Sequence, residues 1–308
     1  MNKNNSRNKW ALFYLKLWNM RLHFKNLFLF FEITWKKSRL WHHFKIWALS
    51  PVSWRKKVAR LEAQKKYEQV IAICNRKRKH QRLLPEIYEI IGRNLRDLNR
   101  IDEAYENLTH AQQLNSPSPS LCYELGLIHF IKRNYSQARK AMETAIQKGY
   151  DTAPLRIHLG KVYYQMGMLD RAEYCFKRVL DLYPHEGSLY FLLGIVYKSK
   201  IEYQLAIDAF SNAVKFGSNQ KEEHLGLAEI YTRLGYWDNA VREYEAILEF
   251  EPNNFIAHYF LGRIFEIQGL EEKAISEYII ANKIDPEDED TKQKLTQLLA
   301  SPVNIENR

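Results

Sequence analysis

The 308-residue sequence has few cysteines and few residues that break regular structure. Its three cysteines, Cys74, Cys122 and Cys175, lie far apart and form no Cys-x-x-Cys pair. This pattern excludes a disulfide framework and a zinc knuckle of the usual spacing, and it favours a reducing compartment such as the cytoplasm. With only 12 glycines and nine prolines, the chain has little loop punctuation and is expected to be mostly helical.

Catalytic motifs are absent as well. The sequence contains no Gly-rich phosphate loop, no Gly-x-Ser-x-Gly turn and no His-Glu-x-x-His pair. The neighbours His42 and His43 lack a carboxylate or cysteine at ligand spacing, and the acidic run 285–290 is typical of a solvated helix start. We therefore expect no enzymatic activity, no metal site and no cofactor.

Acidic residues are scarce in the first part of the chain. Residues 1–84 carry 21 Lys/Arg against three Glu, a net charge of +18, whereas residues 85–308 carry 25 Lys/Arg against 33 Asp/Glu, a net charge of −8. Six of the seven tryptophans lie within residues 1–54. The N-terminal part thus differs from the rest in charge and in tryptophan content. This difference indicates that the two parts contact different surroundings, or that they bind each other.

A 34-residue period runs through the rest of the chain. Alanine recurs six times at this interval, at Ala104, Ala138, Ala172, Ala206, Ala240 and Ala274. Twelve residues before each alanine stands a glycine, or once Ala228, and four residues after it stands a large apolar residue. Small residues twelve apart let two antiparallel helices approach closely at their crossing. Each helix pair leaves an apolar face that the next pair must cover, so the units must stack.

The turns of these units have their own signature. Gly167, Gly235 and Gly269 stand between the two helices and suit a left-handed helix end. The stretches 159–184 and 261–286 then resemble the tetratricopeptide repeat family, with its small and aromatic residues in the first helix, Ala-x3-aromatic in the second and a closing proline. The resemblance covers residues 85–288. It implies an all-α, right-handed α-solenoid of stacked antiparallel helix pairs (TPR superhelix).

The resulting organisation assigns every segment a place. Residues 1–50 form a basic aromatic amphipathic arm, and residues 51–84 form a degenerate repeat in which Val58 and Val70 replace the small residues. Residues 289–300 form a capping helix with Asp290 as its N-cap and Leu295, Leu298 and Leu299 on the last repeat; residues 301–308 are a tail. The six repeats span 85–118, 119–152, 153–186, 187–220, 221–254 and 255–288.

In this family the first helices line a concave groove, where ligands usually bind. Steps of three and four residues along the first helices predict groove-facing side chains that are apolar in the middle and charged at the ends. They also include Leu225, Glu229 and Thr232, and those chosen as the partner-binding groove are Arg93, Tyr123, Leu127, Phe130, Ile157, Lys161, Tyr164, Phe191, Ile195, Lys198, Tyr259 and Arg263. The expected partner is a protein that supplies an amphipathic helix or an extended peptide. An alternative is that the N-terminal arm of the same chain covers the groove.

The N-terminal arm combines aromatic and basic residues with one acid, Glu32. On a helical wheel the charges form one stripe and the apolar residues flank it, which suits the interface of an anionic membrane. Lys16, Arg21 and Lys25 interrupt the apolar stretch, so a simple transmembrane helix is not expected. The residues expected to contact the membrane or a partner are Trp10, Trp18, Arg21, Lys25, Phe31, Trp35, Lys36, Arg39, Trp41 and Trp47. Docking on a partner and a cleaved organelle transit peptide are the alternatives.

These features predict a non-catalytic interaction scaffold or assembly factor that acts peripherally to a membrane. The basic run 76–80 supports an alternative, a nucleic-acid-binding regulator that uses residues 1–84. A third hypothesis is an accessory subunit of a large membrane-associated complex. Fold alone does not choose among these functions.

Overall fold

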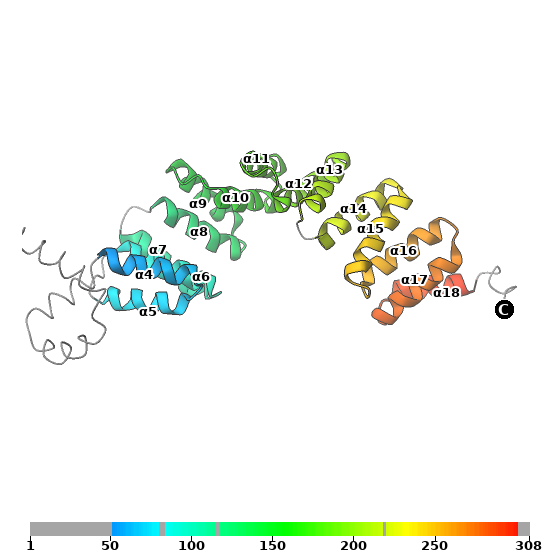
Figure 1. Cartoon of the computed structure of the whole chain (residues 1–308), viewed down its shortest axis with the longest axis horizontal. Helices are drawn as coiled ribbons and strands as arrows, with labels where there is room; N and C mark the ends of the chain where they lie inside the picture. Colours follow the sequence, from blue (N-terminus) through cyan, green and yellow to red (C-terminus); the bar gives the residue numbers. More distant parts are fainter. Residues whose placement is uncertain (1–50, 80–83, 115–117, 218–219, 301–308) are drawn as a thin grey trace, which may run out of the picture. The chain divides into compact units, whose positions relative to one another are not determined.

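The computed structural model describes residues 51–79, 84–114, 118–217 and 220–300. Within these ranges the chain forms fifteen α-helices and no strand (Figure 1). The helices are α4 (Pro51–Ala63), α5 (Tyr67–Arg78), α6 (Pro85–Asp97), α7 (Ile101–Leu114), α8 (Pro119–Ile131), α9 (Tyr135–Gln147), α10 (Ala153–Gln165), α11 (Leu169–Leu180), α12 (Gly187–Ser199), α13 (Tyr203–Lys215), α14 (Gln220–Leu234), α15 (Trp237–Phe250), α16 (Phe255–Ile267), α17 (Glu271–Ile284) and α18 (Glu289–Leu299).

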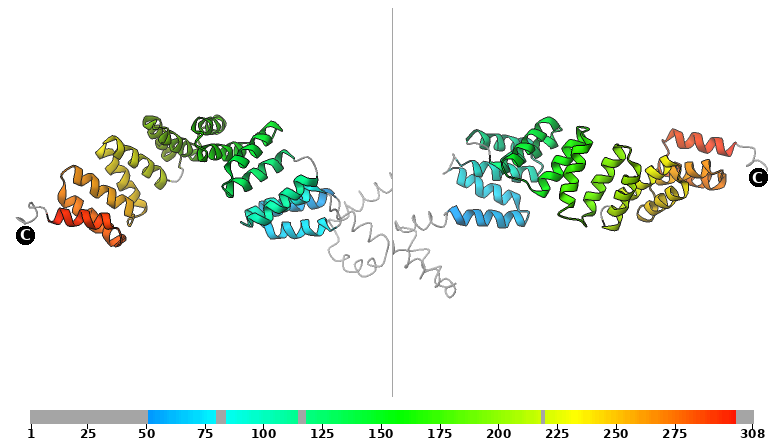
Figure 2. Two further views of the ribbon diagram at one scale, coloured as in Figure 1. Left: turned by 180° about the vertical axis from the view of Figure 1, so that it is seen from behind. Right: turned by 90° about the horizontal axis from the view of Figure 1, so that it is seen from above.

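The chain divides into two compact units, of which the first ends at Arg100 and the second begins at Ile101. The division falls inside the segment 85–118, which the sequence pattern assigns to one repeat. In the second unit, α8 packs on α9, α10 on α11, α12 on α13, α14 on α15 and α16 on α17. The second helix of each pair then packs on the first helix of the next pair (Figure 2). This confirms the prediction of an all-α fold built from stacked helix pairs.

Small residues mark the points where the two helices of a pair cross. All six alanines of the 34-residue series are completely buried. A Cβ added to Gly160 would lie 2.5 Å from Cε1 of Phe176, and one added to Gly194 would lie 2.7 Å from Cδ1 of Phe210. The glycine of the first helix therefore makes room for the large side chain that follows sixteen residues later. This size complementarity sets the distance between the paired helices.

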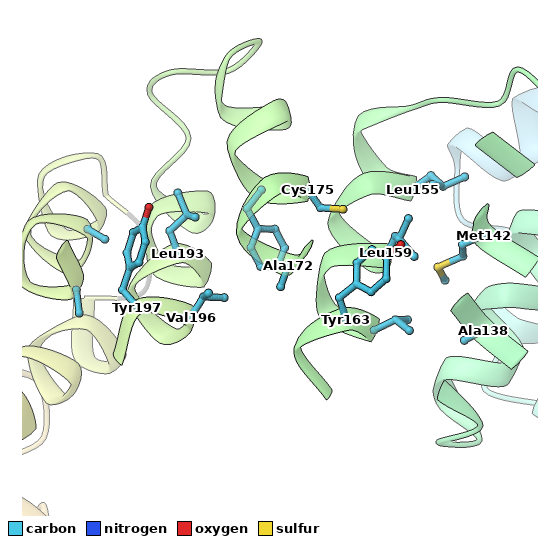
Figure 3. Close-up of a cluster of buried hydrophobic side chains, with 14 of the residues drawn as sticks. Ala138, Met142, Leu155, Leu159, Tyr163, Ala172, Cys175, Leu193, Val196 and Tyr197 are labelled. Atoms are coloured by element: carbon cyan, nitrogen blue, oxygen red, sulfur yellow. The ribbon is translucent and has the colours of Figure 1, made fainter. Parts of the chain in front are cut away.

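The core continues from one helix pair to the next. Figure 3 shows side chains of α9, α10, α11 and α12 between the stacked helices, among them Met142, Leu159, Cys175 and Val196. Each of these residues is at most 3% exposed. Because helices from successive repeats contribute to one continuous cluster, each pair supplies the apolar cover that its neighbour lacks.

Turns between paired helices adopt the left-handed conformation at every 34th residue. Gly167, Gly235 and Gly269 have φ angles of 71°, 75° and 71°, as their sequence position predicts. The same conformation occurs at residues of other types in the same register: Lys65, Asn99, Arg133 and Ile201, with φ between 54° and 65°. The backbone geometry of the turn is thus kept where glycine is missing, and it is least favourable for the β-branched Ile201.

The last helix corrects one detail of the sequence analysis. The N-cap of α18 is Asp288 rather than Asp290, because the Asp288 carboxylate accepts a hydrogen bond from the backbone N–H of Thr291 at 2.8 Å. Asp290 instead accepts a hydrogen bond from the Tyr259 hydroxyl. Thr291 is the buried residue of α18, whereas Leu299 is 42% exposed and covers less of the last repeat than predicted.

The N-terminal arm, residues 1–50, and the tail, residues 301–308, lie outside the described residues. The expectations for Trp10, Trp18, Arg21, Lys25, Phe31, Trp35, Lys36, Arg39, Trp41 and Trp47 therefore stay predictions. Among the helices that the structure does describe, none combines the length and the apolar character needed to cross a membrane.

Candidate functional site

The first helices of successive repeats form one surface, which we call the first-helix face; it comprises α8, α10, α12, α14 and α16. Hydrogen bonds join neighbouring members of this set. The Tyr123 hydroxyl lies 3.1 Å from Nδ1 of His158, and the Tyr164 hydroxyl lies 3.2 Å from Oγ of Ser199. Nζ of Lys198 donates to Oε2 of Glu229 at 2.7 Å. These contacts connect α8 to α10, α10 to α12 and α12 to α14.

Most predicted groove residues of the second unit are partly exposed on this face. Phe130, Ile157, Lys161, Tyr164, Phe191, Ile195, Lys198 and Tyr259 are half-buried, and Arg263 is exposed. Tyr123 and Leu127 are different, because they are only 8% and 7% exposed and belong to the core. Arg93 lies in α6 of the first unit, where it pairs with Glu62 at 2.8 Å.

A hollow of about 590 Å³ opens on the first-helix face of the second unit, within residues 198–260. Lys198 and Ser199 from α12 and Glu229 and Arg233 from α14 line it, together with Ile201 from the turn after α12. Ile230, Tyr203, Tyr244 and Phe260 supply apolar surface, and the Tyr244 and Phe260 rings stack at 5.5 Å with 3° between their planes.

Two hydroxyl groups in the hollow are buried without a partner. Tyr244 is completely buried, and neither its hydroxyl nor that of Thr232 makes a hydrogen bond to any described residue. The Thr232 hydroxyl is close enough to offset part of the rise in the Tyr244 pKa, but the two hydroxyls do not meet the distance and angle of a hydrogen bond. Burial raises the pKa of Tyr244 to about 12. The phenol therefore stays protonated at neutral pH and can donate a hydrogen bond.

Basic side chains outnumber acidic ones around the hollow. Lys198 is paired with Glu229, the one acid among the lining residues. Arg233 is exposed and forms no ion pair with any residue in the described part of the chain. The guanidinium of Arg263 lies 5.8 Å from the centre of the Phe260 ring. The site is therefore electropositive beside an apolar floor.

The turn that carries Ile201 is held in place by a cluster of ion pairs. Nζ of the preceding Lys200 lies 2.8 Å from Glu173, 3.0 Å from Asp170 and 3.1 Å from Glu202. Hydrogen bonds to Glu173 and Asp170 raise the pKa of Lys200, which stays charged. These contacts support a backbone conformation that isoleucine alone would disfavour.

The spacing of groove-facing residues in the sequence predicts Lys198, Glu229 and Thr232 but not the other seven residues that line the hollow. Tyr244 occupies the large apolar position of its repeat, four residues after Ala240, so the sequence pattern predicts a core residue there. Arg233, Ile201 and Phe260 lie outside the three- and four-residue steps that predict the groove-facing side chains. A comparison of register positions provides the missing signal: Tyr278 and Glu266 form a hydrogen-bonded pair in the last repeat, and Tyr244 and Thr232 occupy the same positions one repeat earlier.

The basic run 76–80 is only partly available to a ligand. Lys77 is 8% exposed, and burial lowers its pKa. The Arg78 guanidinium lies 5.6 Å from the centre of the Tyr88 ring. Arg76 and Lys79 are exposed, and His80 lies outside the described residues. In the described ranges no group of three or more His, Cys, Asp and Glu side chains is arranged to hold a metal ion.

Known proteins share this architecture. Three tetratricopeptide repeat models match residues 119–147, 153–186 and 225–289. The chain is 25% identical over 184 residues to anaphase-promoting complex subunit 3 of Schizosaccharomyces pombe, an alignment that covers 59% of this chain and 28% of that protein. It is 24% identical over 178 residues to the BBSome complex member BBS4 of Bos taurus, covering 56% of this chain and 34% of that protein. The chain thus spans about a third or less of these relatives.

A solved structure shows the same fold. The C-terminal part of a TPR repeat-containing protein from Cytophaga hutchinsonii superposes with a TM-score of 0.64 at 16% identity, over 78% of this chain and 98% of that one. The 34-residue register, the buried alanine series and the three family matches agree with one another. The chain is a tetratricopeptide repeat protein.

Proposed function

We propose that the chain is a non-catalytic scaffold or assembly factor that binds a peptide or helix of a partner protein on its first-helix face. One observation carries the proposal: neighbouring first helices are joined by hydrogen bonds, while Phe130, Ile157, Tyr164, Phe191 and Ile195 remain only half-buried between them. An apolar row on a rigid surface suits the capture of an apolar helix face or peptide. The two relatives are named as members of complexes, which supports a role as a complex subunit.

The test is affinity capture with the full-length chain and identification of bound proteins by mass spectrometry. Ile195→Glu places a charge on the first-helix face. Leu182→Glu is the matched control, because Leu182 lies after α11 and is 69% exposed. We expect I195E to lose partners that L182E keeps, while circular dichroism shows both to be folded. Retention of every partner by I195E would refute the proposal.

We also propose that residues 1–50 hold the protein at an anionic membrane surface or at a membrane-associated complex. Support comes from composition: this segment has ten Lys/Arg, one acid and five of the seven tryptophans. Full-length protein should float with anionic liposomes, and a 51–308 truncation should not. If both stay in the soluble fraction but co-purify with a membrane complex in mild detergent, the accessory-subunit alternative replaces lipid binding.

Nucleic-acid binding by residues 1–84 is the other alternative. Arg76 and Lys79 are the exposed cations of the described part of the basic run. Binding of this kind weakens steeply with salt, since phosphate contacts release counterions. A salt-dependent gel shift that disappears in the double variant Arg76→Ala, Lys79→Ala would favour this function over the scaffold.

A further inference from the structure

The hollow lined by residues of α12 to α16 contains a hydroxyl that has no hydrogen-bond partner among the described residues. Position 244 is the large core position of its repeat, where the two preceding repeats have Phe176 and Phe210. A tyrosine here adds a hydroxyl, and that hydroxyl is fully buried without a partner in the described chain. In the next repeat the equivalent Tyr278 hydroxyl donates to Oε2 of Glu266 at 2.9 Å. Thr232 stands at the position of Glu266, and its hydroxyl does not accept this hydrogen bond.

The charges around the Tyr244 hydroxyl restrict which groups could accept a hydrogen bond from it. Two of the residues that line the hollow are basic, Lys198 and Arg233, and one is acidic, Glu229; Arg263 lies outside the lining, beside the Phe260 ring. Glu229 is already paired with Lys198 at 2.7 Å. An acidic group therefore gains from Arg233, which has no ion pair in the described residues, whereas a basic group is repelled.

The floor and wall of the hollow favour an apolar or aromatic side chain beside that acid. Phe260 stacks on Tyr244, and Ile230 is 1% exposed beneath the opening. Ile201 is 69% exposed and is held outward by its left-handed turn. Aromatic and aliphatic surface around a few polar groups is the usual composition of a binding pocket.

We propose that this hollow binds an acidic segment of the partner, in which an apolar side chain packs on Phe260 and an adjacent carboxylate accepts hydrogen bonds from Tyr244 and Thr232 and pairs with Arg233. This inference rests on the proposed function and specifies the chemistry of the segment that is bound. Charge also distinguishes a partner's acidic segment from the chain's own N-terminal arm as the ligand of the hollow. Residues 1–50 carry ten Lys/Arg and one Glu, so the N-terminal arm is repelled where an acidic peptide is attracted.

The experiment measures the binding of fluorescein-labelled peptides to the full-length chain by fluorescence anisotropy. Three peptides of equal length alternate phenylalanine with glutamate, glutamine or lysine. We expect the glutamate peptide to bind about tenfold more tightly than the glutamine peptide, and the lysine peptide to bind most weakly. Arg233→Glu should weaken the glutamate peptide about tenfold. Arg178→Glu, an exposed arginine of α11 outside the hollow, is the control for the same charge change and should leave the affinity unchanged.

A second pair of variants tests the unused hydroxyl. Tyr244→Phe should weaken binding of the glutamate peptide several-fold while raising the melting temperature, because it removes a buried hydroxyl without a partner. Tyr278→Phe removes a hydroxyl that has its acceptor, so it should lower the melting temperature and leave the affinity unchanged. A merely structural role of Tyr244 would not separate binding from stability in this way.

The proposal is overturned if the three peptides bind alike, if R233E weakens binding no more than R178E, or if Y244F binds as tightly as the wild type. Absence of binding by all three peptides also overturns it. These results differ from failure of the proposed function: the loss of partners in I195E tests the whole first-helix face and does not depend on residues 233 or 244.

Discussion

The Tyr278 hydroxyl donates to Oε2 of Glu266 at 2.9 Å, and the same register positions one repeat earlier hold Tyr244 and Thr232, whose hydroxyls make no hydrogen bond to any described residue. Glu266 is also bound by Nζ of Lys294 at 3.0 Å, whereas Phe260 occupies the position equivalent to Lys294 in the earlier repeat. In the last repeat, the carboxylate that accepts from the buried Tyr278 phenol is thus also paired with a lysine, and the earlier repeat has no lysine at that position. A neutral acceptor is the suitable replacement at position 232.

Thr232→Gln should give the Tyr244 hydroxyl an acceptor of the length that Glu266 provides. One satisfied buried hydrogen bond is worth about 1 kcal/mol, so the free energy of unfolding in urea should rise by roughly that amount. Because the hydroxyl is then occupied, binding of the glutamate peptide should weaken. Thr232→Val is the control, since it keeps the side-chain shape and supplies no acceptor. A T232Q protein no more stable than T232V would contradict the prediction.

Glu223→Leu should stabilise the protein. Glu223 is completely buried, and neither carboxylate oxygen has a hydrogen-bond partner in the described chain. At the same register position Leu121, Leu155 and Leu189 are at most 1% exposed. Replacing an unsatisfied polar group by the leucine of the other repeats should raise the unfolding free energy by about 1–3 kcal/mol.

The exposed neighbour Glu222 provides the comparison for that substitution. Glu222→Leu changes the same charge in the same helical turn without removing a buried group, so its effect should stay within about 0.5 kcal/mol. Equal stability changes in E222L and E223L would mean that net charge, rather than burial of the Glu223 carboxylate, controls the result.

Gly160→Ala should destabilise the pair formed by α10 and α11. Its Cβ would lie 2.5 Å from Cε1 of Phe176, far inside van der Waals contact. Overpacking of this kind costs about 1–3 kcal/mol. Phe176→Leu removes the colliding ring atoms, so G160A should cost less in the F176L background. Urea unfolding of the four proteins gives the coupling energy directly, and purely additive effects would disprove the contact.

Ile201→Gly should stabilise the turn between α12 and α13. A β-branched residue at φ 65° is unfavourable by about 1–2 kcal/mol, and glycine occupies this position in three other repeats. Because Ile201 is 69% exposed, little core contact is lost. The melting temperature should rise while the glutamate peptide binds more weakly, since Ile201 also lines the hollow. Arg133→Gly, at the same turn position outside the hollow, should not change the affinity.

The thiols should be unreactive until the protein unfolds. Burial raises the pKa of Cys74 to about 12 and that of Cys175 to about 11. At pH 8 the native protein should therefore react negligibly at these sites with 5,5′-dithiobis(2-nitrobenzoate), and unfolding in urea should expose all three thiols, including the buried Cys122.

The same shifts determine the direction of the pH dependence. An unfolded thiol loses its proton near pH 8.5, whereas the folded thiols keep theirs until about pH 11 or 12. The folded state thus binds more protons in this window, and their stabilising contribution is lost as the pH rises through it. Urea midpoints measured from pH 8 to pH 11 should fall, and they should fall less in the double variant Cys74→Ala, Cys175→Ala.

Much of the helix pairing could be predicted from the sequence alone. The small residues of the series and the large residues that pack against them recur at fixed distances in the sequence. In a regular helix, a fixed sequence distance gives a fixed position on the helix surface, so the contacts can be predicted. Gly167, Gly235 and Gly269 likewise have the predicted left-handed turn. The predicted N-cap of α18, Asp290, is two residues from the observed one, Asp288. Aspartate is a suitable N-cap at either position, and only the path of the backbone selects one of them.

Side-chain exposure and the hollow were decided by the tertiary structure. Tyr123 and Leu127 share the spacing of exposed groove residues, yet packing of the neighbouring helices buries them. Ile201 adopts a glycine-like turn because the helices on both sides and the ion pairs of Lys200 require it. The sequence by itself determined which residues pair within a repeat, since that depends on local periodicity. Only the stacked structure decided that Thr232 leaves the Tyr244 hydroxyl unused, because their meeting depends on the distance between side chains of two packed helices.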